Sequence, residues 1–363
     1  GRLADTRNNK VLMSMRILTT VLTIAALGAP AAAHGQSVSE HVREVVRGHA
    51  ERIKAVSYQR GREEQTDRFT KTVKIGSGGE IDLANIAGDI VITRGGGNDA
   101  VIEVVKTSRA SSAEEAREML QLVDVTIEER AGRVEIRTHY PRGDEWQHKD
   151  KKRRSMNVST AFNVTAPSGT RLNVKSISGS IKVNGMKGDL SVESVSGNVV
   201  IGDGGRIAQA KSVSGDVQIN DTTLEGRLDA GSVSGNVRLK GVKARRLDLG
   251  SVSGNVVLED IQCDRVNVHS VSGNVQFQGP LARNGRYEMK SHSGEVRVAI
   301  AGGSGFELEA SSFSGHVRSD FPVTIQGGTS RGPRQRSLHG VYGDGSAVLD
   351  LTTFSGSILI VKR

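Results

Sequence analysis

The feature that most constrains the fold is a four-residue motif, [ST]-x-S-G, that recurs along most of the chain. The hexapeptide SVSGNV occurs at 194–199, 232–237, 251–256 and 270–275, and SVSGDV occurs at 212–217. The first eight motif glycines are 18, 18, 20, 19, 19, 21 and 21 residues apart. Such a period is typical of a repeat protein in which each copy is one structural unit. The motif glycines are Gly179, Gly197, Gly215, Gly235, Gly254, Gly273, Gly294, Gly315 and Gly356, and a degenerate copy, NIAGDIVI, surrounds Gly88.

The residues around each motif alternate between apolar and polar, which indicates β-strands. In RLDLGSVSGNVVLED (246–260), Leu247 and Leu249 share one phase, whereas Val252 and Val256 share the other. A change of phase requires a bend, so we expect two short strands joined by a corner at S-V-S-G, with the valine of the motif filling the core. Variable segments such as 241–246 and 260–265 would form a third side.

A unit of this size is too short for a propeller blade, which needs about 40 residues. About six inward side chains contribute roughly 9–18 kcal/mol, whereas ordering about 19 residues costs roughly 19–38 kcal/mol. One unit is therefore unstable alone, and neighbouring units must stack on it. The sequence predicts an all-β, parallel β-solenoid, right-handed, with three short sides per coil of about 19 residues.

Stacking would align the motif in columns and gives it a structural role. Glycine would supply a backbone φ that other residues resist at a corner. Serine and asparagine side chains would satisfy backbone groups along the stack; the asparagines are Asn198, Asn236, Asn255 and Asn274. A catalytic serine is needed once, and the centre of GSVSG (250–254) is Val252, which excludes the G-x-S-x-G nucleophile elbow.

The chain divides into four parts. Residues 1–35 comprise upstream residues and a signal peptide that starts at Met15, with an apolar stretch at 17–30 too short to anchor in a membrane. Residues 36–66 form a polar leader. Residues 67–160 hold the first coil, a helix at 112–122 with a capping box from Ser112 to Glu115, and a hairpin at 123–139. Residues 161–363 form the repeat array, which ends in a last coil at 347–363.

The coils, the early IDLANIAGDIVI (81–92) followed by the helix and hairpin, and the closing LDLTTFSGSILIVK resemble the bacterial putative-adhesin family. The likeness extends over roughly 67–363. It implies a β-solenoid domain of unknown function, and it brings no catalytic residues.

Residues with catalytic or metal-binding chemistry do not gather in the repeat frame. The acids of the coils, Asp203, Asp229, Asp248, Asp260 and Asp264, are scattered, which argues against a glycan-active enzyme. We expect no catalytic residues, no cofactor and no metal site, because the histidines occupy different columns. Cys263 has no intramolecular partner and is interpreted as a packed thiol, and Trp146 as a residue that packs against its own domain. The histidines concerned are His269, His292, His316 and His339.

Charge and export narrow the function further. The formal net charge is +9, with basic runs at 149–154 and 331–336 that are interpreted as solvated loops. Few aromatic residues accompany them, so nucleic-acid binding is not expected. The sequence favours a non-enzymatic, exported cell-envelope protein of the periplasm, the outer surface or the medium, with no transmembrane segment in the mature chain. Its partner would be a protein, a polysaccharide or an anionic lipid. An envelope-stress or signalling accessory is the alternative, and a glycan-active β-helix enzyme comes third.

Overall fold

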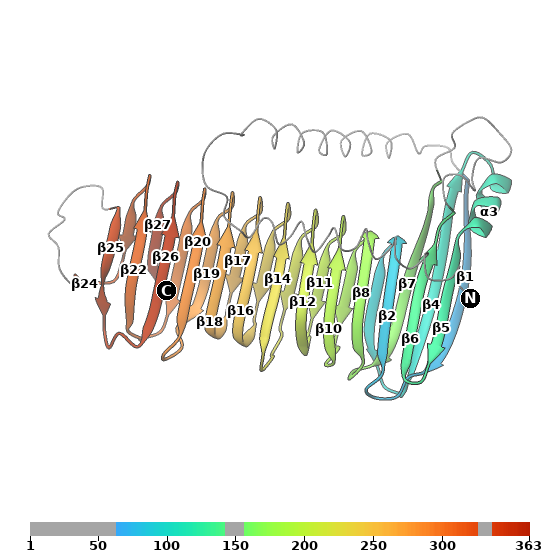
Figure 1. The fold of residues 1–363 in the computed structure, drawn as a ribbon, viewed down its shortest axis with the longest axis horizontal. Helices are drawn as coiled ribbons and strands as arrows, with labels where there is room; N and C mark the ends of the chain where they lie inside the picture. The colour runs from blue at the N-terminus through green and yellow to red at the C-terminus, as the bar shows by residue number, and fades with distance from the viewer. Residues whose placement is uncertain (1–62, 142–155, 326–335) are drawn as a thin grey trace, which may run out of the picture. The chain divides into compact units, whose positions relative to one another are not determined.

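The computed structural model describes residues 63–141, 156–325 and 336–363. Contacts divide the chain into residues 1–63 and 64–363, and the fold below is that of the second unit. This unit consists of a 13-stranded sheet, a 14-stranded sheet and the helix α3 (Ala113–Leu122). The two sheets face each other along the whole stack (Figure 1). The predicted all-β parallel β-solenoid, with its helix and hairpin near the N-terminal end, is confirmed.

The first sheet contains, in spatial order, β1 (Glu63–Lys74), β4 (Asp99–Ala110), β7 (Val158–Pro167), β3 (Ile90–Gly95), β9 (Ile181–Asn184), β11 (Val199–Gly202), β13 (Val217–Asn220), β15 (Val237–Lys240), β17 (Val256–Glu259), β19 (Val275–Pro280), β21 (Val296–Ala301), β27 (Ile358–Lys362) and β23 (Val317–Ser319). The second sheet contains β24 (Thr324–Ile325), β25 (Ser337–Tyr342), β22 (Phe306–Ser312), β26 (Ala347–Thr353), β20 (Arg286–Ser291), β18 (Gln262–Ser270), β16 (Lys243–Ser251), β14 (Arg227–Ser232), β12 (Arg206–Ser212), β10 (Asp189–Ser194), β8 (Arg171–Ser178), β2 (Glu80–Ala87), β6 (Arg133–His139) and β5 (Asp124–Arg130).

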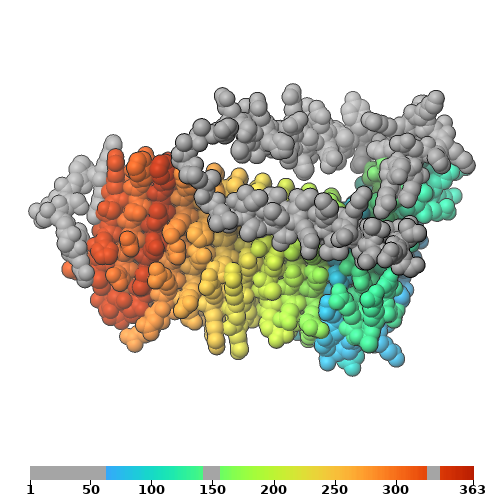
Figure 2. Space-filling view, viewed as in Figure 1, coloured from blue at the N-terminus to red at the C-terminus, as the bar shows by residue number. Residues whose placement is uncertain are grey.

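Successive strands of a coil alternate between the two sheets, and each pairs in parallel with the equivalent strand of the next coil. Leu247 lies opposite Val266 in the second sheet, and Val256 lies opposite Val275 in the first. The coils follow one another without a break in the space-filling view (Figure 2). The motif period thus corresponds to one turn of the solenoid, as the sequence predicts.

The expected third side is shorter than the other two. It is a tight turn after each first-sheet strand, followed in some coils by a short arm that runs directly into the second-sheet strand, as at Lys243 opposite Gln262. The turn residues adopt left-handed backbone conformations, which reverse the chain within one or two residues. These left-handed residues are Gly185 (φ 74), Asp203 (φ 47), Asp221 (φ 49), Gly241 (φ 62) and Asp260 (φ 53).

One hydrophobic core runs between the sheets. The inward positions of the central coils are fully buried, among them Leu247, Val256 and Leu258 at 0% exposure. Cys263 joins this core at 4% exposure. Continuous burial of this kind supplies the stability that a single coil lacks.

Antiparallel strands cover the N-terminal end of the stack. β4 pairs antiparallel with β7, and β5 forms a hairpin with β6, which extends the second sheet beyond β2. Between β4 and β5, helix α3 starts at its N-cap Ser112, whose side chain accepts from the Glu115 amide at 3.2 Å. The first strand β1 begins at Glu63, within the segment expected to be a polar leader. Covering the end in this way protects open backbone groups from pairing with other chains.

The C-terminal end departs from the expected order of coils. The final strands β26 and β27 were expected to form the last coil, but they lie between β20–β21 and β22–β23 (Figure 1). The outermost coil is therefore β22–β23, and the antiparallel strands β25 and β24 extend its second-sheet side. The prediction was wrong because sequence order does not determine which strand pair a returning chain joins.

Candidate functional site

The first motif residue faces the inside of the corner. The Ser251 hydroxyl accepts from the Gly254 amide at 2.9 Å and donates to the Gly235 carbonyl of the preceding coil at 3.0 Å. The equivalent residues pair in register along the second sheet and are all at most 6% exposed. The hydroxyls of Ser176 and Ser270 have no hydrogen-bond partner among the described residues. Most other hydroxyls of this buried serine column join a coil to its neighbour. Its members are Asn85, Ser176, Ser194, Ser212, Ser232, Ser251, Ser270, Ser291, Thr353 and Ser312.

The motif glycines form a second column, where adjacent backbones approach closely. A Cβ atom on Gly254 would overlap the carbonyl group of Gly235, and the same overlap recurs from coil to coil. At the C-terminal end Gly356 stacks on Gly294, and Gly315 stacks on Gly356. Only Gly179 among the nine has a positive φ (134°). Lack of space for a side chain, rather than the expected unusual φ, is the reason for glycine in the other eight.

The asparagines form a third column that bonds to backbone rather than to ligand. Asn236 Oδ1 accepts from the Asn255 amide at 3.0 Å, and Asn255 Oδ1 accepts from the Asn274 amide at 2.9 Å. Asn198 Oδ1 accepts from the Asp216 amide at 2.9 Å, and Asn274 Oδ1 accepts from the Glu295 amide at 2.9 Å. Each amide oxygen thus satisfies a backbone donor left free at the corner of the next coil.

The second motif residue points outward, and the expectation that it fills the core was wrong. Val252 is half-buried, Val271 is 40% exposed and Ile177 is 49% exposed. The phase change comes one residue later than the sequence suggested, so two successive residues, Val252 and Ser253, face away from the core. The second motif residues form a mainly apolar line, the corner ridge, which is half-buried in the central coils and exposed toward both ends. It consists of Ile86, Ile177, Val195, Val213, Val233, Val252, Val271, His292, Phe354 and Phe313.

Aromatic rings occupy the corner ridge at its C-terminal end. Phe313 and Phe354 stack with ring centroids 4.7 Å apart and planes 6° apart, and His292 stacks on Phe354 at 5.0 Å and 7°. Phe313 is 67% exposed and Phe354 is 48% exposed. The rings border a shallow groove of about 580 Å³, which Lys290 and His269 also line. The groove thus combines apolar rings with polar and cationic groups.

The outer face of the second sheet carries charged side chains in register. Asp229 lies directly opposite Asp248, so the structure brings together two acids that the sequence had suggested were scattered. Arg227 Nε lies 2.7 Å from Asp248 Oδ2, and Arg246 reaches both oxygens of that carboxylate, at 2.7 and 2.9 Å. Burial opposes ionisation of Asp248, but the hydrogen bond from Arg246 and the charge of Arg227 outweigh it and hold the pKa below its usual range. An acid held ionised in this way cannot donate a proton near neutral pH.

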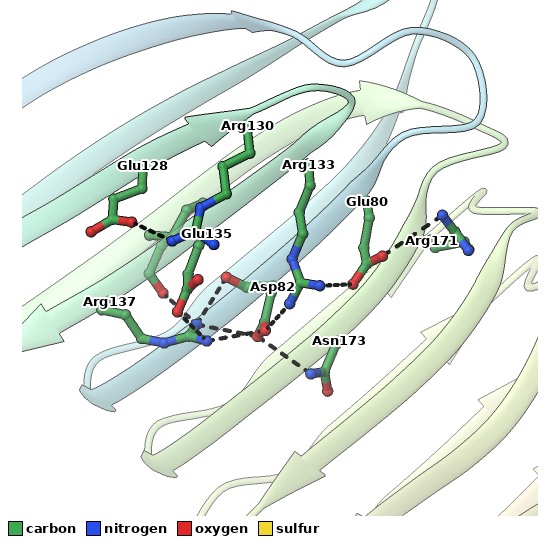
Figure 3. Close-up of polar contacts among 10 residues, drawn as sticks. Glu80, Asp82, Glu128, Arg130, Arg133, Glu135, Arg137, Arg171 and Asn173 are labelled. Atoms are coloured by element: carbon green, nitrogen blue, oxygen red, sulfur yellow. Dashed lines mark hydrogen bonds and ion pairs between the residues drawn. The ribbon is translucent and has the colours of Figure 1, made fainter. Parts of the chain in front are cut away.

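A denser charged cluster joins the N-terminal hairpin to the coils. Asp82 accepts from Arg133 Nη2 at 3.0 Å, from Arg137 Nη1 at 3.1 Å and from Asn173 Nδ2 at 3.3 Å (Figure 3). The Asp82 side chain is 10% exposed, and Glu80 beside it pairs with Arg133 at 3.3 Å. Because these bonds link β2, β6 and β8, the cluster has a structural role.

The remaining candidate residues that the structure describes do not group into a reactive site. Burial raises the pKa of Cys263 to about 11, which keeps the thiol protonated at neutral pH. Asp203 and Asp260 are turn residues rather than members of an acid cluster. In the described ranges, no three His, Cys, Asp or Glu side chains group as metal ligands would. His316 Nδ1 lies 3.2 Å from the Ser357 hydroxyl; His339 is on β25. Trp146, the basic run at 149–154 and residues 1–35 lie outside the described residues, as does all of the second basic run except Arg336.

No helix in the ranges that the structure describes combines the length and apolar character needed to cross a membrane.

Two outward-facing features were not predicted from the sequence, the corner ridge and the charged side chains in register on the second sheet. Both features become visible when the coils are aligned on the motif glycine. Arg227, Arg246 and Asp248 lie at fixed distances before the glycine of their own coil, and His292 and Phe313 occupy the second motif position, where other coils have valine.

Comparison with known proteins found similar solved structures and a matching family model. Solved structures similar to this chain include a putative cell adhesion protein from Clostridium sporogenes, with 10% identity, coverage of 82% of this chain and 100% of that chain, and a TM-score of 0.23. A putative adhesin from Bacteroides fragilis has 13% identity, 81% and 97% coverage and a TM-score of 0.38. A putative lipid binding protein from Parabacteroides distasonis has 14% identity, 81% and 97% coverage and a TM-score of 0.41. No curated protein matches. The model of the Toastrack DUF4097 family matches residues 79–361, and the chain therefore belongs to that family.

Proposed function

We propose that the protein is a non-enzymatic, exported β-solenoid of the cell envelope that binds a surface partner through its corner ridge. The observation that carries the proposal is the exposure of the ridge, above all of Phe313 and Phe354 at 67% and 48%. Stacked aromatic rings on a protein surface leave large apolar areas in water, and such areas commonly mark binding sites. Aromatic side chains also contribute strongly to binding energy at interfaces.

The construction of the corner supports a binding role for the ridge. The serine and glycine columns hold adjacent coils together from the inside, so the ridge residue is not needed to fill the core. Its side chain can therefore vary from valine to phenylalanine without disturbing the stack. A rigid array of this kind holds its exposed side chains in place before a partner arrives, which reduces the entropic cost of binding.

The charged groups support a binding role over catalysis. Asp248 is committed to two arginines, and Glu288 is held by Lys290. Carboxylates in such pairs stabilise a surface but are poorly suited to moving protons. Export is supported by the apolar stretch after Met15.

The proposal is tested with the full chain and a ridge variant, Phe313→Ser with Phe354→Ser. Recovery of the protein on washed envelope fractions should fall at least tenfold for the ridge variant. The matched control is Val101→Ser with Leu122→Ser, which removes two other exposed apolar side chains, at 39% and 42% exposure. The control should be recovered like the wild type. Equal recovery of wild type and ridge variant would overturn the binding role, and a wholly cytoplasmic location on fractionation would overturn export.

A further inference from the structure

Four arginines occupy the same position in four successive coils. Arg227 lies opposite Arg246, Arg246 opposite Arg265, and Arg265 opposite Arg286. Neighbouring strands of a sheet are about 4.8 Å apart, so these guanidinium groups form a dense cationic row, the arginine column. Like charges placed directly opposite each other destabilise a sheet unless a counter-charge lies nearby.

The first half of the arginine column has its counter-charge within the protein. Arg227 and Arg246 both bond to Asp248, whose side chain is 12% exposed. Arg246 makes the bidentate contact that suits the planar guanidinium. These two positive charges are therefore committed to the fold.

The second half has less counter-charge within the protein. Asn267 takes the place of the carboxylate in the coil of Arg265, directly opposite Asp248. In the next coil the Glu288 carboxylate bonds to Lys290, and this bond lowers its pKa. Among the described residues, neither Arg265 nor Arg286 has a hydrogen bond or ion pair from its side chain. The charge of Arg286 also lowers the Glu288 pKa, but this carboxylate is bonded to Lys290. Two adjacent guanidinium groups on one exposed surface are thus without a hydrogen bond or ion pair among the described residues.

A cavity of about 520 Å³ surrounds this unpaired half. Besides the arginines it is lined by the neutral hydrogen-bonding side chains of Asn267, Asn284 and Ser346, and by one carboxylate, Glu288. The Asn267 Oδ1 atom is buried and has no hydrogen-bond partner. A buried acceptor of this kind is costly unless a donor reaches it. The cavity therefore holds two guanidinium groups without a hydrogen bond or ion pair and an unused acceptor, and the one carboxylate in its lining, Glu288, is paired with Lys290.

We infer that this cavity binds an acidic polysaccharide, with Arg265 and Arg286 holding carboxylates and with Asn267 accepting from a sugar hydroxyl. The inference goes beyond the binding role proposed above, because this cavity contains no residue of the corner ridge. Guanidinium groups match carboxylates in shape and charge. The neutral side chains Asn267, Asn284 and Ser346 suit hydroxyl groups. An arginine column that repeats from coil to coil suits a polymer whose charge repeats from sugar to sugar.

The test uses the full chain and oligogalacturonate, which carries a carboxylate on every sugar, with binding measured by calorimetry at low salt. Arg265→Gln with Arg286→Gln should weaken binding at least tenfold. The matched control, Arg238→Gln with Arg297→Gln, removes the same charge from exposed positions of the other sheet and should change binding less than threefold. Asn267→Asp places a carboxylate beside Arg265 and should also weaken binding. Methyl-esterified oligogalacturonate, which lacks the charges, should not bind.

Several results would overturn the inference. They are equal binding by the wild type and the Arg265–Arg286 variant, an equal loss in the control, or equal binding of the methyl ester. Binding to vesicles of phosphatidylglycerol without binding to oligogalacturonate would overturn the polysaccharide and identify an anionic membrane as the ligand. If oligogalacturonate binding failed but envelope recovery still depended on the ridge, the proposed function would stand. If the ridge variant were recovered like the wild type while oligogalacturonate binding remained, the ridge would lose its binding role and the anion site would stand.

Discussion

The inner and outer sides of the S-x-S-G corner reverse the usual distribution of polar and apolar residues. Ser251, a first motif residue, is 5% exposed, whereas Val271, the second motif residue of the next coil, is 40% exposed. The inner position is occupied in every coil by a buried polar residue, and the outer one changes from valine to histidine and phenylalanine. The difference shows that close stacking of backbones demands polar groups and no bulk inside the bend. The outer side is left free for a partner.

The largest expected effect comes from adding bulk to the inner side. Gly254→Val should lower the free energy of unfolding by about 4 kcal/mol or more, because its Cβ would overlap the Gly235 carbonyl between two β-strands that cannot easily separate. Denaturant unfolding measures the change. Ser253→Ala, on the exposed outer side, should stay within about 0.5 kcal/mol of the wild type.

Equal effects of these two substitutions would contradict the contrast between the two sides. If Gly254→Val prevents folding, Gly254→Ala provides a smaller addition at the same place. It should still destabilise the protein more than Ser253→Ala does, because even one Cβ meets the Gly235 backbone.

The second effect concerns the hydrogen bonds of the inner side. Ser251→Ala should cost about 1–3 kcal/mol, because it removes a partner from the buried amide of Gly254 and from the carbonyl of Gly235. Thermal and denaturant unfolding both report the change. Ser251→Thr keeps the hydroxyl, as Thr353 does in its own coil, and should recover most of the loss. A loss in Ser251→Thr as large as that in Ser251→Ala would show that volume rather than hydrogen bonding matters at this position.

The fold could be predicted because the inner side is periodic. A repeat of about 19 residues with alternating apolar positions requires stacked coils, and the two strand arms of 246–260 lie where alternation places them. Val252 was misplaced because alternation alone cannot show how many residues a bend consumes. The position of β26 between β20 and β22 could not be predicted, since any coil end offers the same backbone groups to a returning strand.

The candidate sites were harder to predict because outward residues are free of the core's constraints. The pairing of Arg227 and Arg246 with Asp248 depends on register between coils, and coil lengths vary. Aligning the coils on the motif glycine restores that register, since each of these arginines precedes its own glycine by eight residues. The unpaired state of Arg265 then depends on the single exchange of an acid for Asn267, which no periodicity reveals.

The third effect tests whether the outer charges also support the fold. Asp248→Asn should lower the free energy of unfolding by about 1–2 kcal/mol at pH 7, because Arg227 and Arg246 then face each other with only Asp229, 3.9 Å from Arg227, as a nearby counter-charge. The folded pKa of Asp248 lies below its usual range. Its stabilising contribution is therefore present above about pH 4 and is lost as the pH falls through the folded pKa. The difference between variant and wild type should shrink accordingly, and a difference independent of pH would assign the effect to packing.

The smallest effect on stability is expected on the outer side of the corner. Phe313→Ser should change the free energy of unfolding by no more than about 0.5 kcal/mol, since the ring is 67% exposed and contacts mainly Phe354. Phe306→Ser, a buried ring of the same coil, should cost about 3–5 kcal/mol and is the matched comparison. If Phe313→Ser destabilised the protein as much as Phe306→Ser, the aromatic stack would be part of the core, and its exposure would no longer argue for a partner. A small effect, together with lost envelope recovery, would separate the residues that hold the coils together from those that face a partner.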